Sequence, residues 1–396
     1  MNRFLAASLL ALAASCADRP APKGGVPAGV AGVTIRQAEG ADHPETIVSG
    51  DPEPGILDSM VLMRDQFRGV RSVLLDPAGG VWVLDRDAKR IVHFSDDGTM
   101  GPTIGSIGKG DGQFNDPHSL AWGAGDLMVY DPGNSRVGRF HPDGAWVGSW
   151  PIVPITGGPN ARFFASGTSA SAWLFQFSFL SSGEAAPGFA RFPLTPRGDV
   201  RWVPPTRSGP LPNIVLCTVG DSQSSFSAPY TTGELWQPSP DGQLYHVEGA
   251  DYVVSTVDSA GTVLRSLRRE VAGVPISDLE WAEGLAPLER FRTAHPGSCN
   301  GAFTRPATRS AIRALSLDDR SRLWVERMTD SSPLWEVWEG DRLIGAVPGI
   351  DRIAAVQVDI RGDRFAVLAM GDNGAPEVRV YRYHLTAPIA PSPAGR

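Results

Sequence analysis

Residues 112–120 read Gly112-Gln113-Phe114-Asn115-Asp116-Pro117-His118-Ser119-Leu120, and the chain runs on through Asp126-Leu127-Met128-Val129-Tyr130-Asp131 to Pro142-Asp143-Gly144. An imperfect copy of this stretch precedes it over residues 67–98. Four landmarks recur at a separation of 46 residues by subtraction: Asp85 and Asp131, Arg90 and Arg136, Phe94 and Phe140, Asp97 and Asp143. The chain is therefore a repeat array.

The period of this repeat decides the fold class. A period in the mid forties, with short alternating apolar runs and turn dipeptides, is typical of β-propeller blades and not of helical solenoids. One blade is a small twisted sheet that cannot bury both of its faces alone, so blades have to stack. The 396 residues leave room for about six blades plus tails. We therefore predict an all-β, six-bladed β-propeller of four-stranded antiparallel blades over residues 51–387.

The rhythm of strands and turns continues after the second copy. We assign blade three around Trp173–Phe179, blade four to Leu235–Leu267, blade five to Ile312–Val347 and blade six to Ile353–Tyr383. Blade six lacks a fourth strand of its own. Propellers commonly close by lending a strand from one terminus to the last blade, which removes an exposed sheet edge. The segment Gly55–Met63, just before blade one, is the candidate for that closing strand.

Residues 274–304 break the rhythm between blades four and five. The run from Asp278 to Phe291 predicts a short helix, a turn and a second short helix. Cys299 lies within this insertion, and Cys217 precedes it by 82 residues by subtraction. An even pair of cysteines in an exported protein indicates a disulfide, and this one is expected to fasten the insertion to the propeller.

The N-terminus has the composition of an export signal. Arg3 is followed by an apolar stretch from Phe4 to Ala14, which is too short to span a bilayer. We predict a signal peptide over 1–15, a tether over 16–50 and a C-terminal tail over 388–396. Ala13-Ala14-Ser15-Cys16 resembles a bacterial lipobox, which implies lipidation of Cys16 and a cell-envelope location. Cleavage by the ordinary signal peptidase, giving a soluble secreted protein, is the alternative.

Charge excludes one class of partner. The net charge is −7, and no run of five or more Lys or Arg residues occurs. A nucleic-acid-binding surface requires a basic patch, so we do not expect DNA or RNA as a partner. Contact with a membrane is expected through the lipid anchor alone.

The quoted stretches resemble a known family. The pattern Phe-x-x-Pro-x-x-Leu-Ala, then Asp-Leu-x-Val-x-Asp, Gly-Asn-x-Arg-Val and Pro-Asp-Gly, is similar to the NHL repeat of six-bladed β-propellers. The resemblance implies a binding platform whose ligand sits at one mouth of a central channel. We expect Arg71, Asp116 and His118 to line part of that mouth and to bind a protein, peptide or glycan without a cofactor. The sequence leaves the oligomeric state open.

A catalytic alternative remains on the same fold. Pro117-His118-Ser119-Leu120 is similar to the segment of peptidyl-hydroxyglycine α-amidating lyases whose histidine binds zinc. Such a site needs about three converging histidines, yet Arg71 stands where blade one aligns with His118, and Pro132 replaces the arginine that follows the second-strand aspartate in those lyases. We predict no metal site and favour a non-catalytic protein, with a metal-dependent lyase or lactonase as the alternative.

Two other groups of residues receive a structural interpretation. A sugar-lactonase-like propeller would use acids such as Asp85, Asp131 and Asp116 to hold a metal ion. However, Asp85 and Asp131 end equivalent strands, where a carboxylate can accept hydrogen bonds from turn amides. Likewise Trp324, Trp335 and Trp338 could line a carbohydrate groove, but their alternation along strands favours a core between blades. A structural envelope protein that contacts partners through residues 274–304 is a third possibility.

Overall fold

The structure is a computed structural model. It describes residues 34–39, 43–63, 67–123, 125–151, 162–165, 171–179, 185–193, 201–203, 214–231, 235–258, 261–353, 356 and 358–386. Most of these residues lie in antiparallel sheets, and the described part of the chain has one α-helix. The all-β class predicted from the repeat is confirmed.

The two copies of the repeat each form a four-stranded antiparallel sheet. Blade one consists of β4 (Val70–Leu75), β5 (Val81–Asp85), β6 (Arg90–Phe94) and β7 (Met100–Ile104). Blade two consists of β8 (Ser119–Gly123), β9 (Asp126–Asp131), β10 (Arg136–Phe140) and β11 (Trp146–Pro151). The landmark positions Asp85 and Asp131 each end the second strand, as the repeat predicts.

Four further sheets follow. Blade three has β12 (Arg162–Ala165), β13 (Ser171–Phe179), β14 (Ala185–Pro193) and β15 (Arg201–Val203). Blade four has β18 (Leu235–Pro238), β19 (Leu244–Val247), β20 (Val253–Val257) and β21 (Val263–Glu270). Blade five has β23 (Ile312–Leu317), β24 (Leu323–Arg327), β25 (Leu334–Glu339) and β26 (Arg342–Pro348). Blade six has β27 (Asp359–Arg361), β28 (Arg364–Met370), β29 (Pro376–His384) and a strand from the N-terminal region.

That N-terminal strand is β3 (Ile56–Met63), which pairs antiparallel with β29. The predicted closing strand is therefore confirmed. Gly55 allows the close approach, because a Cβ atom at this position would lie 2.0 Å from the carbonyl oxygen of His384. The Gly55 amide also donates to the carbonyl of Ala346 in β26, at 2.8 Å.

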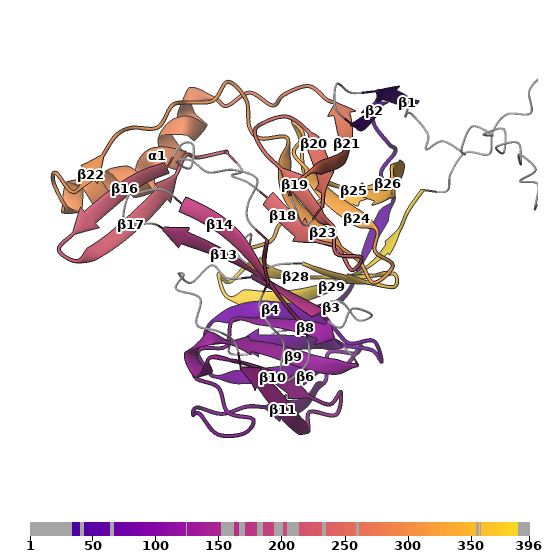
Figure 1. The fold of residues 1–396 in the computed structure, drawn as a ribbon, viewed down its shortest axis with the longest axis vertical. Helices are drawn as coiled ribbons and strands as arrows, with labels where there is room; N and C mark the ends of the chain where they lie inside the picture. Colours follow the sequence, from indigo (N-terminus) through magenta and orange to yellow (C-terminus); the bar gives the residue numbers. More distant parts are fainter. Residues whose placement is uncertain are drawn as a thin grey trace, which may run out of the picture.

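The first strands of the blades follow one another along an arc in the order β12, β8, β4, β27, β23 and β18. Figure 1 shows the yellow strands of blade six between the purple strands of blade one and the orange strands of blade five. Apolar side chains fill the spaces between blades one and two, one and six, five and six, and four and five. Trp324 and Trp335 pack toward blade six, and Trp338 packs toward blade four, all three without exposed surface. The tryptophans thus form core between blades, as predicted.

The tether prediction is wrong for part of its range. Residues 34–49 form β1 (Thr34–Glu39) and β2 (Pro44–Ser49), and β2 adds to blade four by pairing parallel with β21. The physical reason is apolar burial, because Ile47 and Val48 are buried and Val48 joins the core between blades four and five. The segment from β1 to β3 is thus a strap across blades four, five and six.

The insertion also differs from the prediction. Instead of two short helices, one helix, α1 (Asp278–Ala294), continues through Pro287. Ser277 and Glu280 form a capping box at its start, and Leu288 packs on Val215 after the proline, so helix geometry persists. The insertion is also larger than expected, because the hairpin of β16 (Ile214–Val219) and β17 (Ser222–Ser227) pairs with β22 (Cys299–Asn300).

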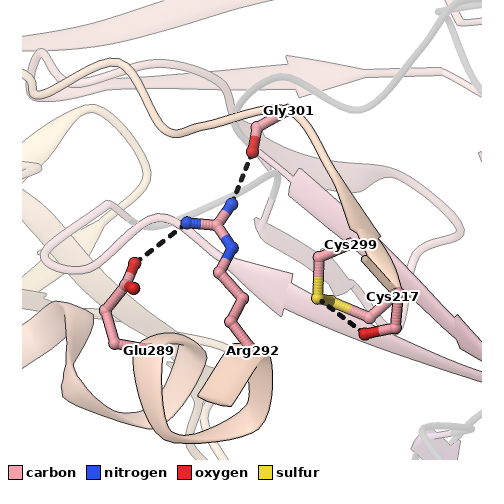
Figure 2. Close-up of a disulfide and its surroundings, with 6 residues drawn as sticks. Cys217, Glu289, Arg292, Cys299 and Gly301 are labelled. Carbon is pink, nitrogen blue, oxygen red and sulfur yellow. Dashed lines mark hydrogen bonds and ion pairs between the residues drawn. A yellow bond between two sulfur atoms is a disulfide. The ribbon is translucent and has the colours of Figure 1, made fainter. Parts of the chain in front are cut away.

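Cys217 and Cys299 form a disulfide, with their Cα atoms 4.0 Å apart. The predicted pairing is confirmed. The prediction that the disulfide fastens the insertion to the propeller is wrong, because the bond joins β16 to β22 within the insertion. Figure 2 shows Arg292 of α1 beside this bond, donating to Glu289 and to the carbonyl of Gly301. The three strands, α1 and the disulfide form a unit with its own small core, which we call the insertion unit.

The predicted signal peptide, the lipidation site Cys16 and the predicted tail 388–396 lie outside the described residues. Of the helices described, none combines the length and apolar character needed to span a lipid bilayer.

Candidate functional site

Two buried aspartates shape the turns that carry the site. The carboxylate of Asp131 accepts the backbone N–H groups of Asn115 at 3.1 Å and Asp116 at 2.7 Å. Asp85 does the same in blade one, accepting the amides of Arg68 at 3.1 Å and Gly69 at 2.9 Å. The predicted hydrogen bonds from turn amides are confirmed. Each repeat thus fixes the loop that leads into its own innermost strand.

The loop before blade two presents a cluster of three side chains. Asp116 lies between a histidine and an arginine: Nε2 of His118 is 2.9 Å from Oδ2, and Nε of Arg86 donates to Oδ1 at 2.7 Å. Arg86 comes from the turn between β5 and β6 of blade one. The side chain of Asp116 is 34% exposed and that of His118 is 9% exposed. This mouth cluster therefore sits where blades one and two meet, at the edge of solvent.

The local backbone holds the cluster in place. The amide of His118 donates to the carbonyl of Tyr130 at 2.9 Å, which fixes the residue just before β8. Tyr130 packs edge-on against the imidazole, with ring centroids 6.4 Å apart. Gly133 lies so close that a Cβ atom there would be 2.6 Å from Cβ of Asp116. A larger residue at 133 would displace the carboxylate.

The electrostatics keep Asp116 ionised. Partial burial opposes its charge, but the hydrogen bonds from Arg86 and His118 outweigh that effect and lower the pKa of Asp116. The hydrogen bond between Arg86 and Asp116 also raises the pKa of the Arg86 guanidinium. Burial, with a further contribution from the charge of Asp116, raises the pKa of Tyr130 to about 12. The cluster therefore offers a fixed carboxylate acceptor and a fixed cation, and Tyr130 remains a neutral phenol at ordinary pH.

Arg71 is not a member of the hydrogen-bonded mouth cluster. It occupies a β-bulge on β4, where the ladder with β5 skips from Val70 to Ser72, and its side chain is exposed. No hydrogen bond or ion pair joins it to another residue of the described part of the chain. The structure therefore brings Asp116 and His118 into contact, whereas Arg71 forms no hydrogen bond or ion pair with either of them.

Arg86 is the member of the cluster that the sequence interpretation missed. The arginine that is absent after Asp131, where Pro132 stands, is present after Asp85 in the other copy. Comparison of both copies with the lyase pattern, instead of blade two alone, could have found it. Its contact with Asp116 crosses a blade boundary, so the sequence gives no direct signal for the pairing.

Blade five holds a second group of charged residues that the sequence interpretation missed. On the side facing blade four, Glu336 accepts from Arg327 at 2.7 Å and Arg269 at 3.2 Å, and both arginines also contact Asp51 of the strap. On the side facing blade six, Glu326 accepts from Arg352 at 2.6 Å and lies 3.7 Å from Arg313. Both glutamates are fully buried.

The candidate metal ligands have other hydrogen-bond partners in the described part of the chain. Across the described ranges, no three His, Cys, Asp or Glu side chains are grouped so that they could hold a metal ion. His118 is paired with Asp116 and not with further histidines. Asp85 and Asp131 use their oxygens on turn amides.

Comparison with known proteins gives a partial similarity. No family model matches the chain. It is 34% identical over 108 residues to NHL repeat-containing protein 3 of Mus musculus, covering 26% of this chain and 31% of that protein. The protein of the same name from Homo sapiens is 30% identical over 128 residues, or 31% of this chain and 37% of that protein. The chain thus matches about a third of the length of these relatives.

Solved structures give a weaker likeness. A putative exported protein from Bacteroides fragilis has a TM-score of 0.44 at 10% identity, covering 86% of this chain and 99% of that chain. Virginiamycin B lyase from Staphylococcus aureus has a TM-score of 0.43 at 12% identity, covering 82% and 98%. A likeness of this extent carries no argument about this chain. What the sequence and the curated relatives support together is a similarity to NHL-repeat proteins over part of the chain.

Proposed function

We propose that this protein is a six-bladed β-propeller of the NHL-repeat type that binds a protein, peptide or glycan at the mouth formed by the first strands, without catalysing a reaction. The observation that carries this proposal is the mouth cluster of Arg86, Asp116 and His118. Its charged groups stand on loops fixed by buried aspartates, and recognition sites are commonly built from loops held on a rigid scaffold. Closure of the ring, with blade three beside blade four, is part of the proposal.

The arrangement favours binding over catalysis. Both carboxylate oxygens of Asp116 already accept hydrogen bonds, and the partly exposed side chain stays charged. A fixed acceptor beside a fixed guanidinium can recognise a ligand that offers both a donor and an acceptor. Because neither group has to move, little conformational entropy is lost on binding.

A comparison of two baits tests this function. Purified wild-type protein and the Arg86→Gln, His118→Ala variant are each immobilised and exposed to an envelope extract and to a glycan array. We expect ligands that the wild type retains and the variant loses, while both unfold at similar temperatures. Equal retention by both baits would place binding elsewhere and contradict the proposal.

A metal-dependent lyase or lactonase is the second candidate, and one observation favours a catalytic role. The bond from Nε2 of His118 to Asp116 resembles the way a carboxylate orients a general base. This candidate predicts stoichiometric zinc or calcium in the purified protein and a loss of thermal stability in chelator. Elemental analysis that finds neither metal would exclude it.

We also propose that the protein is exported and anchored by a lipid on Cys16. Lipidation at the first residue after the signal peptide would place the propeller outside the cytoplasm, linked by the residues before β1. Membrane fractionation of the wild type and the Cys16→Ala variant tests this. The wild type should stay with membranes and the variant should not, and equal distribution of the two would contradict the anchor.

A further inference from the structure

We infer that the mouth contains an oxyanion subsite made by Arg71 of blade one and Arg313 of blade five. The ligand accordingly carries a carboxylate or a phosphate group. This inference rests on the proposed binding function and goes further by stating that the ligand is negatively charged.

The register of the sheets shows that the two arginines are equivalent. In blade five the ladder between β23 and β24 skips from Ile312 to Ala314, so Arg313 is a bulged residue. In blade one the same skip occurs at Arg71. A bulged residue has no partner across the ladder, and bulges commonly redirect a side chain next to a functional site. Two blades therefore present an arginine from the same point of the innermost strand.

Their places in the arc bring them to one opening. The first strands β4 and β23 flank β27 of blade six. An innermost strand has neighbours on both faces, so an exposed side chain on it reaches solvent at the centre of the arc or at the strand end. Arg71 is exposed and the side chain of Arg313 is 32% exposed. His118 aligns with the same position in blade two, so the arginines belong to the same mouth as the mouth cluster.

Neither arginine has a carboxylate of its own among the described residues. The nearest acid to Arg313 is Glu326 at 3.7 Å, which Arg352 already holds at 2.6 Å. Arg71 has no acidic partner in the described ranges. In a chain with a net charge of −7, one guanidinium without an acidic partner among the described residues and one that shares its carboxylate with Arg352 leave an excess of positive charge at this point. They attract an anion toward the mouth.

The buried charges beneath Arg313 point to a specialised site. The ladder partner of the equivalent first-strand residue is Leu84 in blade one and Tyr130 in blade two, but it is the fully buried Glu326 in blade five. Oε1 of Glu326 and Nε of Arg352 are buried without a hydrogen-bond partner among the described residues. Buried ion pairs add little stability compared with apolar residues, so the fold alone does not account for this departure from the repeat.

Binding of small anionic probes tests the subsite. D-glucuronate supplies a carboxylate, inorganic phosphate supplies a phosphate, and D-glucose is the neutral comparison; each is titrated into the full chain by calorimetry. We expect the wild type to bind one of the anions and not glucose, with affinity that falls as salt rises. Arg71→Gln and Arg313→Gln should each weaken the anion by about tenfold or more, because each removes a charge-assisted hydrogen bond.

Matched variants separate charge from structure. Arg71→Lys should recover part of the affinity, whereas Arg382→Gln, at a half-exposed residue on β29, should leave it unchanged. Equal binding by the wild type and the Arg71→Gln, Arg313→Gln double variant would overturn the subsite. Absence of anion binding by the wild type would also overturn it. If the bait comparison still finds ligands that depend on Arg86 and His118, the proposed function stands and only the subsite fails.

Discussion

Asp131 is the residue on which the geometry of the mouth cluster depends. It is buried and accepts hydrogen bonds from two backbone amides and from the side chain of Asn134. Asp131→Ala would leave these donors unpaired, at a cost of about 2 to 4 kcal/mol in the free energy of unfolding. Urea unfolding measures this, with Asp143→Ala as the matched control, because Asp143 is exposed and accepts the amide of Ala145 alone among the described residues. Equal losses in both variants would contradict the anchoring role.

Asp359 on β27 predicts how stability depends on pH. Burial raises its pKa to about 6, although Arg361 and the amide of Leu75, which donates to Oδ2 at 2.7 Å, favour the charged form. A carboxyl whose pKa is higher in the folded state than in the unfolded state stabilises the fold at low pH, and this contribution is lost as pH rises from about 4 to about 6. Asp359→Asn removes the titration but keeps an acceptor for the Leu75 amide.

We therefore expect Asp359→Asn and the wild type to have similar stability at pH 4, and the variant to be more stable by up to about 3 kcal/mol at pH 7.5. Denaturant unfolding at several pH values measures the difference. Parallel profiles for the two proteins would show that Asp359 titrates normally and would contradict its raised pKa.

For individual residues, the sequence predicts the contacts of those that recur in both copies of the repeat. It does not predict the contacts of residues that occur in one copy alone. The hydrogen bonds of Asp85 and Asp131 follow from their matched positions. The contact between Arg86 and Asp116 does not, because it joins two blades and each residue occurs in one copy alone. The buried Glu326 was also missed, since recognising it requires the register of blade five.

At the scale of elements, the insertion unit depends on its disulfide. The bond joins β16 to β22, and the loop it closes spans 82 residues. In the chain-entropy description, closing a loop of this length stabilises the folded state by at most about 4.5 kcal/mol. The Cys217→Ser, Cys299→Ser variant should show faster amide hydrogen exchange in β16, β17 and α1, while β5 of blade one keeps its protection. Uniformly faster exchange across the blades would contradict the independence of the unit.

The closing strand is the other element that a single residue can test. A Cβ atom at Gly55 would meet the carbonyl oxygen of His384, so Gly55→Ala should loosen β3 from β29 and cost about 1 to 3 kcal/mol. Thermal unfolding measures the loss, and faster exchange of the β29 amides locates it. The neighbouring Ile56 is 60% exposed, so Ile56→Ala is the control and should have little effect. A neutral Gly55→Ala would contradict this account of closure.

Strands could be predicted where turn residues flank a run of alternating apolar residues. Elements without both signals were predicted less accurately. The closing strand could be predicted because blade six lacked a strand. The addition of β2 to blade four could not, since parallel pairing between distant segments leaves no periodic signal. The single helix was mistaken for two because Pro287 usually ends a helix, whereas packing of Leu288 in the insertion unit keeps this one continuous.

At the scale of the whole molecule, two features connect the blades: the strap and the arc of first strands. The strap crosses blades four, five and six and places Asp51 against Arg269 and Arg327. The arc gathers Arg71, His118 and Arg313 at equivalent points of three blades. Fold class followed from the repeat period, but the ligand did not, because the residues that distinguish the mouth are those that break the repeat.

Site-specific photo-crosslinking in living cells tests the central claim most directly. A diazirine amino acid is placed at the exposed Asn115, next to the mouth cluster, and, as a control, at Arg382 on β29. The account predicts a covalent adduct on illumination at position 115 that the Arg86→Gln, His118→Ala background abolishes, with no adduct at position 382. No adduct at position 115, or equal adducts at both positions, would contradict binding at the mouth.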